Sequence, residues 1–314
     1  MPKKKDSLVF GLKLIVSLSL LGFILFWKTS PKAIFRVLSE VDLFWIILSF
    51  SLHSLGLLIS AVRWQILIRA QGDTASLIFL AKSYLVGAFF NNFLPTRIGG
   101  DAVRIWDGSK SSQSVLKSFA IVLVERLTGI LFLLLFALAG ALIRIDMARN
   151  KPIIWVSLIL GGCGIVFLFL FLSPLTPKIL KLLPDKKFLE KIKQKTMSLR
   201  ETVLFYRGKK AALAKALFWA LLLQINVIVH FFFIGKALHL DISFIDYFIF
   251  IPIVLLIQLI PITINGLGLR EGAYVVFLQY YGHTSDTAVS FALIDVGFML
   301  IVGIIGGIIY MTRR

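Results

Sequence analysis

Long apolar runs separated by short polar segments dominate the pattern of hydrophobic positions along this chain. About 20 apolar residues in a helix cross a bilayer, and six runs reach that length: 8–27, 43–62, 118–143, 153–173, 212–234 and 288–311. Two further apolar runs, 77–95 and 247–281, are interrupted by proline, glycine and charged residues. The pattern therefore predicts an all-α polytopic membrane protein with about six full transmembrane helices and two broken segments.

The two broken segments share one spacing: proline, four residues, glycine, three residues, arginine. It occurs in FLPTRIGGDAVR as Pro95, Gly100 and Arg104, and in LIPITINGLGLR as Pro261, Gly266 and Arg270. In a membrane, irregular backbone is tolerated only where it is buried in protein or lines a wet cavity. Interrupted hydrophobic segments at matching places in two halves indicate a transporter's binding site. Three residues could coincide by chance, but the shared apolar context argues for a repeat.

A basic segment, 174–211, sets the predicted orientation. Twelve Lys or Arg occur from Lys178 to Lys215, eleven of them within this segment, which predicts a cytoplasmic location by the positive-inside rule. Lysines near the N-terminus and arginines at the C-terminus place both termini on the same side. The helical spacing of apolar residues in this segment fits an amphipathic helix on the anionic inner leaflet, and a solvated basic loop is an equal alternative.

Counting spans from these anchors makes both broken runs re-entrant. The chain returns to the cytoplasm near Arg63 and Arg69, so the hairpin 77–104 enters and leaves from the cytoplasm, whereas 247–281 enters and leaves from outside. We therefore predict one domain, 1–314, whose halves 1–152 and 153–314 form an inverted repeat. Dividing 247–281 into two full spans, which gives eight in all, preserves the same count.

Composition supports a membrane protein and argues against several other classes. Hydrophobic residues make up 58% of 314 and charged residues only 16%, whereas soluble domains average about 25% charged. The net charge of +18 is distributed between apolar runs, which favours anionic lipid over nucleic acid as its partner. The single cysteine and the absence of a Cys/His spacing pattern predict no metal site and no cofactor.

The residues around the two breaks are the candidate substrate-binding groups. Arginine offers phosphate a planar fork of donors, glycines let the backbone approach a ligand, and a helix that restarts after each turn points its positive end at an anion. The candidates are Asn91, Asn92, Arg97, Gly99, Gly100 and Arg104 in the first hairpin, and Asn265, Gly266, Gly268, Arg270 and Glu271 in the second.

Three further charges lie inside predicted spans, where each one needs an explanation. Glu125 and Arg126 are adjacent and cannot face the same way on a helix, so structural pairing and function are equally open for them. Asp295 needs a partner from another helix, for which Arg126 and Arg270 are candidates. Asn226, His53 and His230 also lie within spans, where interhelical hydrogen bonding is the preferred interpretation over a proton relay.

The motifs NNFLPTRIGGDAVRIW (91–106), VERLTG (124–129) and PITINGLGLREG (261–272) resemble the lysylphosphatidylglycerol synthase transmembrane-region family. In multiple peptide resistance factors such a domain is fused to a synthase, and the resemblance implies the flipping of aminoacylated phosphatidylglycerol between leaflets. Other relatives are linked to hopanoid or polyprenyl-glycolipid handling. The residues that match the family's charged positions are Arg104, Glu125, Arg126, Arg270 and Glu271. No synthase domain follows within these 314 residues, so we expect no lysyl transfer.

We therefore expect a multi-pass protein of the plasma (inner) membrane that moves an anionic or aminoacylated phospholipid, or a polyprenyl-type glycolipid, between leaflets. The main alternative is a membrane-embedded transferase acting on a lipid carrier, with Glu125 or Glu271 as its base. A third alternative is an accessory partner of a separate lipid synthase. No Ser/His/Asp or Cys/His arrangement in the sequence indicates hydrolysis, which favours a transporter over an enzyme.

Overall fold

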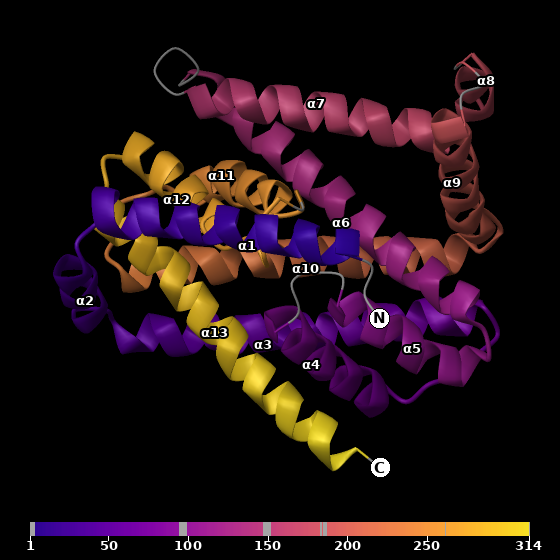
Figure 1. The fold of residues 1–314 in the computed structure, drawn as a ribbon, viewed down its shortest axis with the longest axis horizontal. Helices are drawn as coiled ribbons and strands as arrows, with labels where there is room; N and C mark the ends of the chain where they lie inside the picture. The colour runs from indigo at the N-terminus through magenta and orange to yellow at the C-terminus, as the bar shows by residue number, and fades with distance from the viewer. Residues whose placement is uncertain are drawn as a thin grey trace.

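A computed structural model describes residues 4–93, 99–146, 152–182, 184, 187–260 and 262–313, and the described residues are helical with no strand. The α-helices are α1 (Lys4–Phe23), α2 (Pro31–Ser39), α3 (Leu43–Ala70), α4 (Leu77–Phe93), α5 (Gly99–Ser112), α6 (Val115–Ile143), α7 (Pro152–Leu172), α8 (Thr176–Lys181), α9 (Lys187–Leu204), α10 (Lys210–Ala237), α11 (Phe244–Ile257), α12 (Leu269–Tyr280) and α13 (Ser285–Thr312). Figure 1 shows most of the long helices running along the same axis of the molecule. The prediction of an all-α fold is confirmed.

Among the described residues, five helices are long and apolar enough to cross a membrane, namely α3, α6, α7, α10 and α13. The bent pair formed by the end of α1 and by α2 raises the number of candidates to six. Five of the six predicted full spans therefore coincide with these helices, and the sixth, 8–27, overlaps the bent pair. By contrast, α11 and α12 contain 14 and 12 residues, so neither reaches the length of about 20 that a full span requires. Their lengths support a hairpin over two separate spans.

The predicted basic segment contains the amphipathic helix α9. It lies across one end of α7 and α10 rather than along them (Figure 1). Arg200 of α9 donates a hydrogen bond to the carbonyl oxygen of Ser173 at 3.0 Å, which holds α9 against the end of α7. Of the two interpretations of this segment, an amphipathic helix and a solvated loop, the structure shows the helix. Its contact with an anionic leaflet stays a prediction.

Two groups of four helices repeat the same order along the chain. The first is α3–α6 and the second is α10–α13, and each contains a long helix, two short helices and a second long helix. Helices of the first group begin at residues 43, 77, 99 and 115, and those of the second at 210, 244, 269 and 285, a nearly constant separation. The repeat thus lies within the predicted halves, with α7–α9 between its two copies. We call these groups the first and second units.

The two units pack on each other reciprocally. The first helices, α3 and α10, lie together; α4 of the first unit packs on α13, and α11 of the second unit packs on α6. Figure 1 shows α3 and α10 running in opposite directions, as α6 and α13 also do. In each unit, the pair of short helices follows the first long helix. Because α3 and α10 end at opposite ends of the molecule, the pairs α4–α5 and α11–α12 begin at opposite ends as well. This arrangement is what an inverted repeat requires.

Small residues allow the closest of these contacts. On α13, Gly303, Gly306 and Gly307 face α4, where an added Cβ would meet Asn92, the backbone of Leu85 and the Phe89 ring. Helices in membranes associate through such small residues, since they let backbones approach closely. The glycines near the end of the chain therefore position the hairpin of the first unit.

Ion pairs fix the C-terminal ends of α6 and α13, the last helix of each unit. Arg144, directly after α6, donates to both oxygens of Asp246 on α11 at 3.0 and 3.1 Å, and this hydrogen-bonded pairing raises the pKa of the Arg144 guanidinium. Arg313, directly after α13, lies 2.6 Å from Asp107 on α5. Each unit therefore ends with an arginine bound to a short helix of the other unit.

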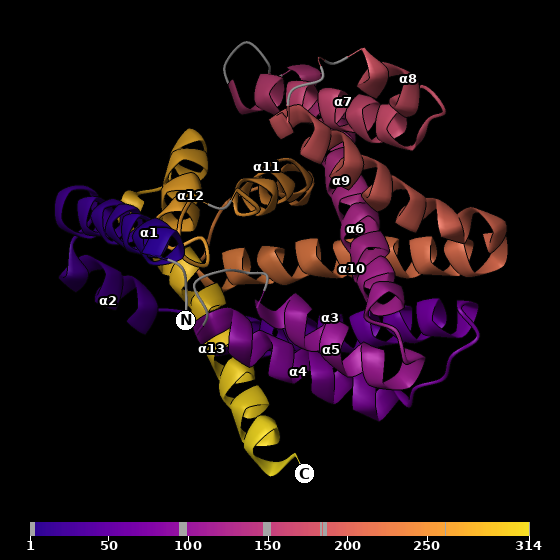
Figure 2. The same ribbon diagram turned by 45° about the vertical axis from the view of Figure 1, so that its right-hand side comes forward.

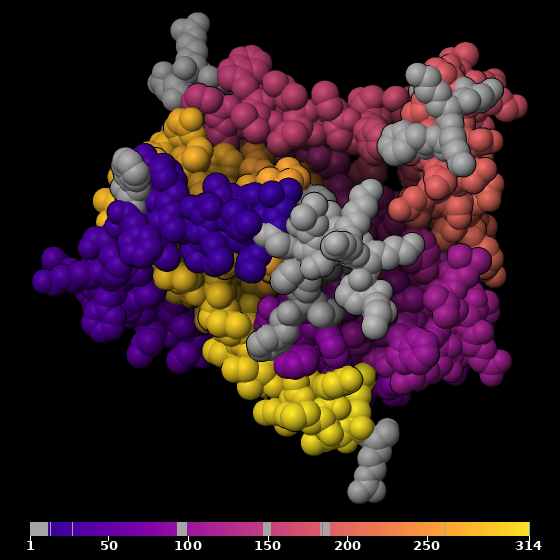
Figure 3. Space-filling model, in the orientation of Figure 1, coloured from indigo at the N-terminus to yellow at the C-terminus, as the bar shows by residue number. Residues whose placement is uncertain are grey.

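The helices outside the two units form two further parts. Figure 2 shows α6 crossing from the group of α3, α4 and α5 to the layer of α7, α8 and α9. On the opposite side, Figure 3 shows α1 lying across the second unit. There the amide of Ile264 donates to the hydroxyl of Ser17 at 2.8 Å, so α1 covers the turn of the second hairpin.

Candidate functional site

A buried carboxylate of α6 lies at the centre of the first charge cluster. Arg63 of α3 donates through Nε to Glu125 Oε1 at 3.4 Å and through Nη2 to the Glu125 carbonyl oxygen at 3.0 Å. Arg104 of α5 donates to Glu125 Oε2, and the hydroxyl of Tyr84 on α4 donates to Oε1 at 3.0 Å. We call Arg63, Tyr84, Arg104 and Glu125 the first cluster. One carboxylate thus faces two guanidinium groups, all three of them buried.

Aromatic rings hold Arg104 in place. Its guanidinium carbon lies 3.9 Å from the centre of the Tyr84 ring and 4.7 Å from that of Trp64. A desolvated cation over an aromatic face gains about 2 kcal/mol. Next to this group, Asp101 lies 3.6 Å from Arg104 and 2.7 Å from Arg126, so it joins the two arginines. Arg104 is therefore fixed in orientation as well as charge.

A cavity of about 280 Å³ opens beside the first cluster. Its charged lining consists of three arginines and two carboxylates, Arg63, Arg104, Arg126, Asp101 and Glu125. Since the arginines outnumber the carboxylates by one, the wall carries an excess of positive charge. Such a wall favours an anion.

The second charge cluster lies in the second unit. Arg270 donates to Glu271 Oε1 through Nε at 3.1 Å and through Nη2 at 2.9 Å, and its Nη1 lies 3.8 Å from Asp295 Oδ2. The other oxygen of Asp295, Oδ1, lies 3.6 Å from Nε2 of His230 on α10. We call His230, Arg270, Glu271 and Asp295 the second cluster. Here one guanidinium faces two carboxylates.

The two clusters occupy matching positions in the repeat. Glu125 and Asp295 have the same place in their helices, since α6 begins at Val115 and α13 at Ser285. Arg63 and His230 also correspond, because α3 begins at Leu43 and α10 at Lys210. Arg104 and Arg270 correspond through the shared spacing of the two motifs. The same backbone arrangement therefore carries opposite excess charges.

A second cavity of about 300 Å³ adjoins the second cluster. Its lining includes His53, His230, Asn265 and Asp295, together with Asn91 and Arg126, which also line the first cavity. The two cavities therefore share a wall. Polar groups from both units surround this shared region.

The structure assembles part of the predicted substrate-binding set. The first cavity is lined by Asn91, Gly100 and Arg104, and the second by Asn91 and Asn265. Asn92 instead donates to the carbonyl oxygen of Met299 on α13 at 2.7 Å. The remaining described candidates, Gly99, Gly266, Gly268, Arg270 and Glu271, are not among the lining residues of either cavity. Arg97 lies outside the described residues, as do Pro95 and Pro261.

At each break, one backbone amide near the start of the following helix is bonded to a side chain of the protein. The Gly100 amide donates to Asn91 Oδ1 at 2.7 Å, and the Gly268 amide donates to Glu271 Oε2 at 2.6 Å. Gly268 has φ of 79°, a conformation that glycine adopts without strain. A carboxylate of the chain itself thus occupies the positive end of α12, where the sequence predicted a bound anion.

The predicted buried charges do form pairs. Glu125 and Arg126 point to different partners, as their adjacency on a helix requires: Glu125 to Arg63 and Arg104, and Arg126 to Asp101. For Asp295, Arg270 is the nearby arginine of the two candidates. The side chain of Asn226 donates to the carbonyl oxygen of Leu52 at 2.9 Å, and His230 contacts Ser49, so the prediction of interhelical hydrogen bonds is confirmed for these two residues.

Sequence reasoning missed the contact of Arg63 with Glu125 and the proximity of His53 and His230 to Asp295. The sequence places the cytoplasmic end of this span near Arg63 and Arg69, but α3 continues to Ala70 and buries the Arg63 side chain. The break in hydrophobicity inside an otherwise continuous helical run was the signal that could have found it. His53, His230 and Asp295 come from three helices, so no ligand spacing along the chain could show their proximity.

These features define a polytopic membrane protein with paired broken helices and a charged interior. The chain belongs to the family described as the lysylphosphatidylglycerol synthase TM region, which matches residues 10–307. It is 23% identical to a UPF0104 membrane protein of Pyrococcus horikoshii over 96% of this chain and 97% of that protein. It is 24% identical to a UPF0104 membrane protein of Methanothermobacter thermautotrophicus, over 84% of each chain. No solved structure shows a significant match. The family confirms the resemblance and is consistent with a lipid-related role in the membrane.

Proposed function

We propose that this protein moves a lipid with an anionic headgroup between the leaflets of the plasma membrane. The observation that carries the proposal is the pair of polar cavities that share Asn91 and Arg126 and are lined by residues of both units. Buried charge inside a membrane protein is costly, and it marks the paths of substrates and ions. A polar path between oppositely oriented units suits a headgroup that must cross the hydrocarbon layer.

The chemistry of the first cavity favours phosphate. Arg104 is buried, oriented by the aromatic rings and next to the cavity, and guanidinium groups bind phosphate oxygens with two parallel hydrogen bonds. Glu125 competes with the ligand for the same donors. That competition limits how tightly a headgroup is held, which a transporter needs because the lipid must leave again. The substrate classes that fit are anionic or aminoacylated phospholipids and polyprenyl-type lipids.

An apolar cavity gives the hydrocarbon chains a place nearby. Its volume is about 580 Å³, and it lies between α6, α7, α9 and α10 with Leu127, Leu131 and Leu168 in its wall. It borders the opposite face of α6 from the first cavity, whose wall contains Gly129 and Ile130. Thus α6 has a polar cavity on one face and an apolar cavity on the other.

The described contacts favour transport over transfer chemistry. A general base needs an oxygen within reach of its substrate. The Glu125 oxygens already accept hydrogen bonds from Arg63, Tyr84 and Arg104, and those of Glu271 accept from Arg270 and the Gly268 amide. Both candidate bases of a transferase are therefore engaged in holding the protein together.

Reconstituted vesicles test the proposal. Purified protein with fluorescent phosphatidylglycerol in both leaflets should make the inner-leaflet label accessible to an added quencher, and mass spectrometry should find the lipid unchanged. Arg104→Lys should lower the initial rate about tenfold or more, because lysine keeps the charge but loses the planar fork. Arg36→Lys is the matched control, since Arg36 lies on α2 with its side chain 80% exposed. Equal rates for both variants, at equal protein content, would remove phosphate recognition from the proposal, and a covalently altered lipid would favour the transferase.

The orientation has its own test. We propose that both termini and α9 face the cytoplasm, so that the first hairpin opens inward and the second outward. In a Cys163→Ser background, cysteines replacing Lys110 and Lys195 should react only with reagent admitted to the cytoplasm, and one replacing Asp241 should react from outside. All three positions are exposed. External labelling at position 110 would make 77–93 a full span and contradict the hairpin.

A further inference from the structure

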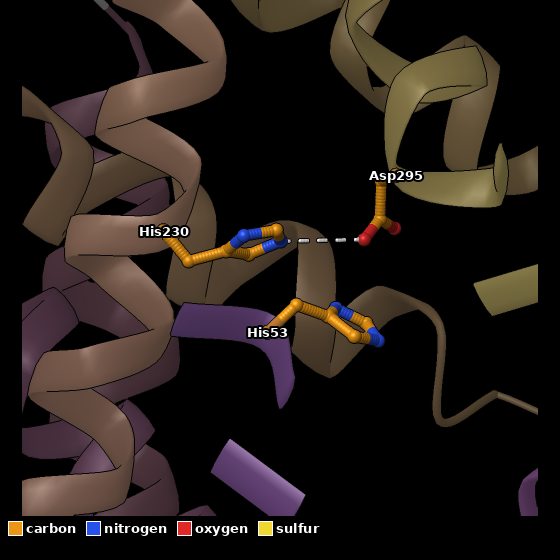
Figure 4. Close-up of side chains that lie close together, drawn as sticks. All are labelled: His53, His230 and Asp295. Atoms are coloured by element: carbon orange, nitrogen blue, oxygen red, sulfur yellow. Dashed lines mark ion pairs between the residues drawn. The ribbon is translucent and has the colours of Figure 1, made fainter. Parts of the chain in front are cut away.

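Three potential metal ligands from three helices meet beside the second cavity. They are His53 of α3, His230 of α10 and Asp295 of α13, and one ligand atom from each lies within 4.8 Å of the others (Figure 4). Figure 4 shows the His230 ring and the Asp295 carboxylate pointing toward each other, with the His53 ring beside them. Proximity of such groups is common without an ion, so a second observation is needed.

The hydrogen bonds of His230 provide one. Nδ1 lies 2.8 Å from the hydroxyl oxygen of Ser49 and 3.0 Å from the Ser49 carbonyl oxygen. Because the hydroxyl donates its proton to the His230 carbonyl oxygen at 2.9 Å, both Ser49 oxygens present lone pairs to Nδ1, and this network assigns the proton to Nδ1. In the neutral ring Nε2 therefore presents a lone pair. This nitrogen is buried, has no hydrogen-bond partner among the described residues and faces the Asp295 carboxylate at 3.6 Å. A lone pair facing a carboxylate is repulsive unless a proton or a metal ion lies between the two atoms.

The charges of the second cluster leave room for that cation. Arg270 contributes one positive charge, whereas Glu271 and Asp295 contribute two negative charges, all of them buried. The net negative charge is costly in a membrane interior. Arg270 approaches Oδ2 of Asp295, whereas His230 faces Oδ1, so the oxygen nearest the histidine stays available.

We propose that His53, His230 and Asp295 bind a divalent transition-metal ion of the zinc type. Two imidazoles and one carboxylate suit such an ion, and three protein ligands leave a fourth position open, here toward the second cavity. Ligands of a tetrahedral ion lie about 3.3 Å apart when each bond is about 2.0 Å, close to the observed separation of Nε2 and Oδ1. The bond from Nδ1 to Ser49 is the outer contact that orients a metal-binding histidine.

Bound metal would join the two units at their interface. His53 belongs to the first unit, and His230 and Asp295 belong to the second. The ion would therefore hold α3, α10 and α13 together and present a Lewis acid to an oxygen ligand in the cavity. Binding at this site does not depend on lipid transport, so it can be tested separately.

The test is metal binding to the purified full chain in detergent, with no histidine tag. After chelator treatment, Co²⁺ and Zn²⁺ should each bind with a stoichiometry of one, Co²⁺ should give the visible absorption of a four-coordinate site, and Zn²⁺ should raise the melting temperature. His230→Gln and Asp295→Asn should each weaken binding at least about tenfold. The control is His239→Asn, which changes an exposed histidine whose positive φ asparagine tolerates.

Failure to bind either ion stoichiometrically would overturn the proposal, and so would equal binding by the wild type and the His230 variant. The first result would mean that a proton on His230 supplies the positive charge instead. If His230→Gln does not give a single peak in gel filtration, His53→Gln gives the same comparison, because it leaves the pairing of His230 with Ser49 and Asp295 in place. Retained binding in that variant would likewise exclude the three-ligand site.

Discussion

The two charge clusters of this protein occupy matching positions in the repeat and have opposite composition. In the first, Glu125 lies between Arg63 and Arg104; in the second, Arg270 lies between Glu271 and Asp295. The second cluster has His230 at the position where the first has Arg63, so it lacks one fixed positive charge. The first cluster is therefore suited to an anion and the second to a cation, although the helices that carry them are arranged alike.

This difference shows how one backbone arrangement, used twice, can supply unlike chemistry. The repeat fixes where the side chains of α3, α5 and α6, or of α10, α12 and α13, converge. A few substitutions at those positions then decide the sign of the local charge. The shared residues Asn91 and Arg126 place the two environments in contact.

The largest expected loss of stability follows a substitution in the first cluster. Glu125→Gln leaves Arg63 and Arg104 buried without their common counter-charge, and breaking a buried pair costs about 3–5 kcal/mol. Asp295→Asn should cost less, because Arg270 keeps its two hydrogen bonds to Glu271. Thermal unfolding in detergent compares the two variants. A greater loss for Asp295→Asn would mean that the second cluster, not the first, depends on a single carboxylate.

An intermediate effect is expected at the glycines of the two breaks. A Cβ at Gly100 would lie 2.5 Å from the Gly87 carbonyl oxygen, and one at Gly268 would lie 2.6 Å from Leu20 Cβ at a φ of 79°. Alanine at either position should lower the free energy of unfolding by about 1–3 kcal/mol. Gly162→Ala is the control, since a Cβ there meets nothing within 4 Å. Unchanged unfolding of Gly100→Ala would show that α4 and α5 can separate at their contact.

The smallest effect is the coupling between Asp295 and its arginine partner. A double-mutant cycle of Asp295→Asn with Arg270→Gln should show coupling of about 0.5–3 kcal/mol, because the two groups lie 3.8 Å apart. The same cycle with Arg126→Gln should be additive, since Arg126 pairs with Asp101. Thermal unfolding of the single and double variants measures both terms. Coupling to Arg126 instead would mean that the shared wall of the cavities brings it to Asp295.

The break positions and the charged residues were visible in the sequence because each disturbs a local pattern. Gly100 and Gly268 interrupt apolar runs, and Glu125 and Asp295 stand out within continuous hydrophobic stretches. The expected partner of Asp295, by contrast, stayed a choice between two arginines. His230 was missed as its neighbour, since histidine in a span has several ordinary roles.

The sequence by itself determined the helical class, the membrane location of the spans and the places where two of them break. It could do so because hydrocarbon imposes its requirement on each segment separately: a span must be apolar over its length, and irregular backbone must be sheltered. Only the tertiary structure decided which charges meet. Arg63 reaches Glu125, and His230 reaches Asp295, because of the rotation and crossing of helices far apart in the chain. Those depend on packing between helices, such as the contact of Gly306 with α4, and no local pattern records them.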